Sequence, residues 1–141
     1  MAPTRWPNAP IRLTGLALAL SLAACATASV PPRSPIGAVV GATEIGDAAW
    51  YGREHQGRAT ASGEPFDMNK LTAAHPTLPL GTQLLVTNLK NGRSVQVRVN
   101  DRGPRTPGRI IDLSYAAAET LGSVQAGLIP VRVRVVSLPN P

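Results

Sequence analysis

The chain has 141 residues, of which 43% are hydrophobic and only 4% aromatic, and its formal net charge is +6. This length fits one domain, whose core must come mostly from Val, Leu and Ile. The single cysteine excludes an internal disulfide. The small number of aromatic rings argues against nucleic-acid binding. The basic charge therefore indicates a different anionic partner or a solvated Arg-rich surface.

Residues 1–24 have the pattern of a bacterial secretion signal. Arg5 and Arg12 supply positive charge, and the apolar stretch of the signal is too short to span a bilayer comfortably. From Cys25 to residue 45 the sequence is rich in Ala, Pro and Gly without apolar periodicity, which predicts a flexible linker. We therefore expect the folded domain over residues 46–138.

Cys25 is the expected site of a lipid anchor. Leu22, Ala23 and Ala24 before it resemble the lipobox of bacterial lipoproteins, in which cleavage makes the lipidated cysteine the first residue. Several acyl chains hold a protein stably at a membrane. In Gram-negative lipoproteins, an Asp after the lipidated cysteine favours retention at the inner membrane. This chain has Ala26 there, which favours export to the inner leaflet of the outer membrane, with the domain in the periplasm. The alternative is a secreted protein with a stray cysteine near its cleavage site.

Much of the remaining sequence alternates as half-buried β-strands do. Residues 95–99 and 131–135 are apolar at every second position. Asn91-Gly92 is a strong hairpin signal between the first of these segments and the strand before it. The predicted strands cover residues 47–52, 83–88, 95–99, 109–113 and 131–135.

One helix is predicted over residues 114–121. Ser114 can cap its first turn, Ala116 favours helix as its neighbours do, and Gly122 can end it. Short strands with a single short helix are typical of a small closed β-barrel. The predicted fold class is therefore mainly all-β, although the pattern alone does not say which barrel.

Polar residues cluster in the loops expected between these strands. The sequence has no Gly-rich nucleotide loop and no Cys/His cluster with metal spacing, so neither a cofactor nor a metal is predicted. Each candidate has an ordinary alternative as a turn residue, a solvated acid or a packed histidine, and for Asp112 we favour pairing with Arg109 or capping the helix. Together they are a reasonable acid–base set. The candidates are Glu64, His75, Asp101 and Asp112.

Eight short motifs, in matching order and spacing, resemble the domain of the RlpA (rare lipoprotein A) family. They extend from Ala49 to about Val136, and they are specific together although each is weak alone. The motifs are Ala49–Gly52, Gly57–Asp67, Leu71–His75, Leu78–Thr82, Val86–Asn88, Asn91–Arg93, Asn100–Pro104 and Gly108–Ser114.

The resemblance implies a fold and an activity. The fold is a six-stranded double-psi β-barrel with one or two short helices, like that of expansins and of another lytic transglycosylase family. The activity is endolytic cleavage of MurNAc–GlcNAc bonds in peptidoglycan, preferably in strands without stem peptides, with formation of 1,6-anhydroMurNAc. The implied partners are glycan strands and the membrane that holds the lipid anchor. A monomer is expected, and divisome or wall-enzyme partners stay open.

The resemblance also implies site residues. Glu64 and His75 match residues that matter for activity in the family, and Asp101 lies at the place of the acid in related barrels. We expect Asp101 to be the acid/base, Glu64 to shape the charge, and His75 to orient a carboxylate or the substrate; exchanging Asp101 and Glu64 is nearly as defensible. The substrate-binding residues predicted are Asp67, Arg58, Arg102 and Arg109.

A single acid/base residue suffices for this reaction. It protonates the leaving oxygen, and the 6-hydroxyl of the muramic sugar, instead of water, attacks C1. One alternative is an expansin-like barrel that binds glycan without cleaving it. The other is a structural lipoprotein that tethers the outer membrane to the wall.

Overall fold

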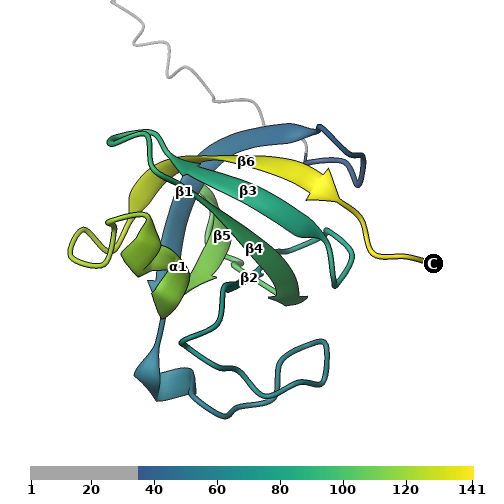
Figure 1. The fold of residues 1–141 in the computed structure, drawn as a ribbon, viewed down its shortest axis with the longest axis horizontal. Coiled ribbons are helices and arrows are strands. Elements are labelled where there is room, and N and C mark those ends of the chain that lie inside the picture. Colours follow the sequence, from purple (N-terminus) through teal and green to yellow (C-terminus); the bar gives the residue numbers. More distant parts are fainter. Residues whose placement is uncertain (1–34) are drawn as a thin grey trace, which may run out of the picture. The chain divides into compact units, whose positions relative to one another are not determined.

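The computed structural model describes residues 35–141, whose six strands form a closed barrel in the order β1-β5-β2-β4-β3-β6 (Figure 1). The closed circle of six strands confirms the expected barrel. Two short helices accompany the strands in the described residues, as expected. The elements are β1 (Thr43–Tyr51), η1 (Arg53–His55), β2 (Thr72–Ala74), β3 (Gln83–Asn88), β4 (Ser94–Asp101), β5 (Arg109–Ser114), α1 (Tyr115–Thr120) and β6 (Ile129–Ser137).

Part of the predicted N-terminal organisation lies outside the described residues. This applies to the signal over residues 1–24, to the lipidation site Cys25 and to the linker as far as residue 34. Between residues 35 and 141, neither helix is long and apolar enough to cross a bilayer.

The strand pairing brings distant parts of the chain together. β1 runs parallel to β5, and β2 runs parallel to β4, so that Tyr51 at the end of β1 lies beside Ser114 at the end of β5. β2 also pairs with β5, which places Ala74 between Asp112 of β5 and Asp101 of β4. β1 and β4 both end on the side of the barrel where the long connection from β1 to β2 lies (Figure 1).

The barrel interior is aliphatic because every second strand residue points inward. On β4, Val95, Val97 and Val99 are buried, while Ser94 and Gln96 between and before them are exposed. β3 and β6 follow the same pattern, as the sequence alternation predicts. Their buried apolar residues are Leu84, Val86, Ile129, Val131, Val133 and Val135.

The predicted hairpin and helix are confirmed. The backbone N–H of Asn88 donates to the carbonyl of Arg93 at 2.8 Å, which closes the turn between β3 and β4. The hydroxyl of Ser114 accepts from the backbone N–H of Ala117 and caps α1. After the helix, Gly122 has a φ of 67°, a left-handed conformation in which glycine is favoured.

Two features of the barrel differ from the predictions. The barrel begins at Thr43 rather than at residue 46, because the start of β1 pairs with β6, and Ile36 of the predicted linker is buried against the core. β2 was not predicted as a strand, because all three of its residues are buried between two neighbours and so show no alternation.

Candidate active site

Two aspartates share a cavity of about 370 Å³ at the side of the barrel where β1 and β4 end. Asp101 is the last residue of β4. Asp112 belongs to β5, which pairs with the other side of β2, so that Ala74 lies between the two aspartates. Carboxylates on the two strands that flank β2 therefore face one space. The lining residues are Trp50, Tyr51, Glu54, His55, Ala74, Asp101, Arg102, Arg109 and Asp112.

Asp101 is held by the backbone through one of its two carboxylate oxygens. Its Oδ1 accepts from the backbone N–H of Ala61 at 3.0 Å and from that of Arg102 at 2.8 Å. The other oxygen, Oδ2, has no hydrogen-bond partner within residues 35–141. The carboxylate thus has a fixed direction and one oxygen that is available to a ligand.

Asp112 is largely buried and is paired with Arg109. Nη2 of Arg109 donates to both carboxylate oxygens, at 2.7 and 2.8 Å, and Nε donates to Oδ1 at 3.2 Å. Burial nevertheless raises the pKa of Asp112 above its ordinary value, and the charge and hydrogen bonds of Arg109 oppose that shift only in part. A carboxyl of this kind holds a proton more readily than an exposed aspartate does.

Tyr51 places a hydroxyl near both aspartates. Its ring packs against Phe66 with centroids 4.5 Å apart and against His55 at 5.3 Å. Burial raises the pKa of Tyr51, and the negative charges of Asp101 and Asp112 add to that shift, so the phenol stays protonated. Its hydroxyl is buried without a hydrogen-bond partner in the described part of the chain, which leaves a donor without an acceptor beside two acids.

Glu64 does not line this cavity. Its carboxylate forms two hydrogen bonds with the guanidinium of Arg98, at 2.7 and 3.2 Å, and accepts from the Asn100 amide at 3.0 Å and the Ser62 hydroxyl at 3.3 Å. The bonds from Arg98 and Asn100 lower the pKa of Glu64 to about 2. Glu64 is therefore ionised at neutral pH and fixes the loop of residues 60–64 to β4, next to Asp101.

His75 also lies outside the lining of the cavity. It is buried, and its Nδ1 accepts from the backbone N–H groups of Thr77 and Leu78, at 3.2 and 3.1 Å, so the geometry assigns the proton to Nε2. Burial and the nearby charge of Arg102 lower the pKa of His75 to about 4, so the ring is neutral near pH 7. Its Nε2 has no partner among the described residues.

The predicted substrate-binding residues divide into two groups. Arg102 and Arg109 line the cavity. Arg102 also donates from Nη1 to the carbonyls of His75 and Leu78, which ties that loop to the cavity wall. Arg58 and Asp67 lie outside the lining, and Asp67 accepts from the backbone N–H of Asn69 in a turn.

The structure adds Trp50, Tyr51, Glu54 and His55 to the residues predicted from sequence. All four lie at the end of β1 or in η1. The sequence pattern of these segments does not indicate that their side chains line the same cavity as residues of β4 and β5. Residues 35–141 contain no group of three or more His, Cys, Asp or Glu that could hold a metal ion. The chemistry that this arrangement offers is proton transfer and charge stabilisation by two carboxyls.

Comparison with known proteins places this site in a family. Residues 43–133 match the family described as "Lytic transglycolase". The "Endolytic peptidoglycan transglycosylase RlpA" of Vibrio cholerae is 54% identical over 101 residues, which are 72% of this chain and 38% of that protein. The protein of the same name from Yersinia pestis is 62% identical over 79 residues, 56% of this chain and 22% of that one. This chain thus spans less than two fifths of the length of these relatives.

Solved structures share the barrel. A Streptomyces papain inhibitor superposes with a TM-score of 0.57 at 27% identity, over 74% of this chain and all of that one. An expansin of Clavibacter michiganensis superposes with a TM-score of 0.55 at 30% identity, over 70% of this chain and 52% of that one. A mutant of the same expansin was solved in complex with cellohexaose. These neighbours are double-psi β-barrel proteins, which confirms the fold implied by the sequence motifs.

Proposed function

The chain belongs to the lytic transglycolase family, and from this premise we propose that it is an endolytic peptidoglycan transglycosylase. It would cleave MurNAc–GlcNAc bonds within glycan strands and leave 1,6-anhydroMurNAc ends. The relatives named RlpA support this activity, although they are much longer than this chain. The observation that carries the proposal is the shared cavity, in which two aspartates and an unpaired phenol meet.

We assign the proton transfer to Asp112. A general acid must hold a proton near neutral pH, and burial raises the pKa of Asp112 in that direction. Asp112 would protonate the glycosidic oxygen as the bond to C1 of the muramic sugar breaks. The resulting carboxylate would then take the proton of the 6-hydroxyl as that oxygen attacks C1, so the proton count balances without water.

Asp101 takes the second role. Because two backbone N–H groups donate to its Oδ1, its ionised form satisfies both donors while Oδ2 stays open to the cavity. A fixed negative charge there would stabilise the positive, oxocarbenium-like sugar ring in the transition state. This assignment keeps Asp101 in the catalytic set and moves the acid/base role from Asp101 to its neighbour across Ala74.

Glu64 and His75 act as positioning residues in this proposal. The low pKa of Glu64 disfavours a role as proton donor near pH 7, and its contacts hold the loop that supplies the Ala61 N–H to Asp101. His75 organises the turn whose carbonyls bind Arg102. Arg102, and Arg109 when it is released from Asp112, would bind lactyl or acetamido oxygens. Asp67 and Arg58 keep only the weaker support of the sequence motifs.

The second candidate is a glycan-binding barrel without catalysis, which the expansin complex with cellohexaose favours. Incubation of the purified protein with peptide-free glycan strands separates the two, with the products identified by mass spectrometry. Anhydro ends, one water lighter than hydrolysis products, support the transglycosylase. Intact strands that co-sediment with the protein support the binder.

We also propose a lipid anchor at Cys25. The lipobox-like sequence before it supports cleavage and acylation, which would place the domain in the periplasm at the outer membrane. Metabolic labelling with a radioactive fatty acid tests this. Label that is lost in Cys25→Ser supports the anchor, and an unlabelled wild-type chain contradicts it.

A further inference from the structure

A second cavity lies beside the first and has no part in the mechanism above. Its volume is about 320 Å³, and it is formed by α1 and the loop that follows it. The lining residues are Tyr115, Glu119, Gly122, Val124 and Gln125. The lining therefore offers one aromatic ring (Tyr115), one carboxylate (Glu119) and one side-chain amide (Gln125).

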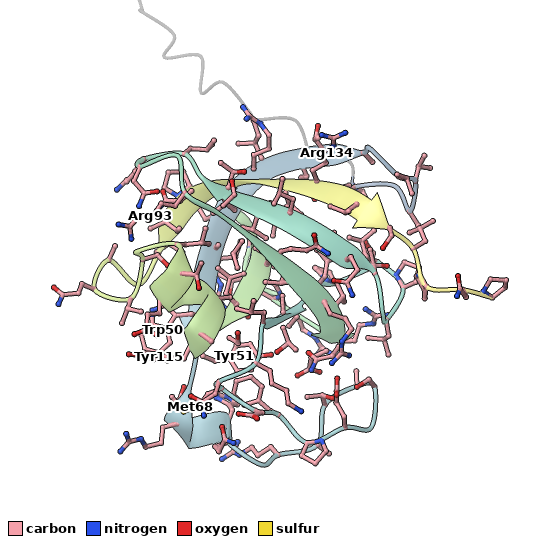
Figure 2. All side chains as sticks on the ribbon, viewed as in Figure 1. Trp50, Tyr51, Met68, Arg93, Tyr115 and Arg134 are labelled. Carbon is pink, nitrogen blue, oxygen red and sulfur yellow. The ribbon has the colours of Figure 1, made fainter. Side chains whose placement is uncertain are left out.

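The two cavities share an aromatic wall. Trp50 lines the first cavity and Tyr115 lines the second, and their rings meet edge to face with centroids 5.5 Å apart. Figure 2 labels the two residues next to each other, and Tyr115 is the first residue of α1. The Trp50 Nε1 donates to the carbonyl of Val124 at 3.2 Å, so the indole is fixed to the rim of the second cavity as well.

Gly52 leaves room for this wall. A Cβ at this position would lie 3.1 Å from the Trp50 ring and 3.9 Å from the Tyr115 Cβ. The absence of a side chain lets the indole lie against the start of α1. The wall is therefore part of how the end of β1 is built.

We propose that the second cavity binds a further N-acetylated sugar of the strand that is cleaved in the first. This inference rests on the proposed function, because an enzyme that acts within a strand must accommodate sugars beyond the two that flank the broken bond. The Tyr115 ring offers an apolar surface to a sugar face. The Glu119 carboxylate and the Gln125 amide offer hydrogen bonds to hydroxyl and acetamido groups.

The experiment is an NMR titration of ¹⁵N-labelled protein with oligomers of N-acetylglucosamine. The Asp112→Asn variant of the whole chain is used, so that no cleavage interferes. We expect the amide signals of Gly122, Val124 and Gln125, and the indole N–H signal of Trp50, to shift with the longer oligomers. Affinity should rise with oligomer length until both cavities are filled.

Variants of the cavity then test which side chains bind. Tyr115→Ala in the same background should weaken binding of the longest oligomer about tenfold, as expected for an aromatic anchor, while Tyr115→Phe should keep most of the affinity. Gln125→Ala tests the cavity without touching the contact with Trp50 and should weaken binding by a smaller factor. Ile45→Ala, an exposed residue outside both cavities, is the matched control and should change nothing.

The outcomes separate this inference from the proposed function. Unchanged amide signals of Gly122, Val124 and Gln125, or equal affinities of the Tyr115→Ala and Ile45→Ala variants, would overturn the second binding site even if anhydro products form. Shifts in the second cavity without any cleavage by the wild-type protein would leave the site standing and remove the transglycosylase.

Discussion

Asp101 and Asp112 are in register with the same residue, Ala74, from opposite sides of β2. This arrangement exists because β2 is three residues long and pairs with both β4 and β5. The two acids are eleven positions apart in the chain, and the intervening segment leaves and re-enters the barrel between them. Strand pairing thus sets how the two carboxyls face the cavity.

Removal of the acid at position 112 should abolish cleavage. Asp112→Asn keeps an acceptor for Arg109 but cannot transfer a proton, and loss of general acid–base catalysis costs roughly a hundredfold or more in rate. The measurement is the rate of formation of anhydro ends from peptide-free strands. Asp47→Asn, in an acid of β1 that does not line the cavity, is the control. Equal rates for the Asp112 and Asp47 variants would remove Asp112 from the mechanism.

Removal of the Tyr51 hydroxyl should separate activity from stability. Tyr51→Phe keeps the ring against Phe66 and deletes a buried group that has no partner in residues 35–141, so the free energy of unfolding should stay equal or rise by about 1 kcal/mol. Catalysis should fall, because a donor beside both aspartates is lost. Thermal unfolding and kcat are measured together, and a less stable variant with full activity would contradict the hydroxyl's role.

Glu64→Gln should lower stability in a pH-dependent way. The pKa of Glu64 is lowered to about 2 in the fold, so its stabilising contribution is complete above its ordinary pKa of 4.5 and is lost as the pH falls towards 2. At pH 7 the variant should be less stable by about 1 kcal/mol, the scale of a partly exposed ion pair. Denaturant unfolding at pH 7 and near pH 2 checks this, and a difference that does not shrink at acidic pH would argue against the ion pair as its source.

His75 should make the fold sensitive to mild acid. The pKa of His75 is lowered to about 4 from 6.5, so the neutral ring is favoured in the fold, and stability is lost as the pH falls from 6.5 towards 4. His75→Asn offers an oxygen to the Thr77 and Leu78 N–H groups without a titrating ring, so its stability should vary less over this range.

His75→Ala is the comparison for that variant. It leaves two N–H donors without their acceptor and should lose both stability and activity at pH 7. Recovery of activity in His75→Asn would support a positioning role. An inactive but fully stable His75→Asn would instead indicate that the imidazole takes part in the chemistry.

The barrel could be predicted wherever side chains alternate between core and solvent. The strands around Val97, Leu84 and Val133 follow that rule. The helix could be predicted because Ser114 is a favourable N-cap residue, and its hydroxyl does accept from the backbone N–H of Ala117. β2 could not be predicted, because Thr72 and its two neighbours are buried on both faces and carry no period.

The candidate site was only partly predictable for a different reason. Asp101 stands out because polar residues replace the alternation at the end of β4, and it does line the cavity. Tyr51 and His55 have no such signal, since their place beside Asp112 depends on the parallel pairing of β1 with β5. The ion pair of Glu64 with Arg98 was also hidden, because an outward-facing arginine on a strand resembles any solvated residue.

The closure of the sheet has a consequence for solubility. In an open sheet, the outermost strands present unpaired N–H and carbonyl groups, which can recruit strands of other molecules and start aggregation. Here β1 pairs with both β5 and β6, so the circle of six strands leaves no outermost strand within residues 35–141. Many copies can therefore be crowded together at high local concentration without joining edge to edge.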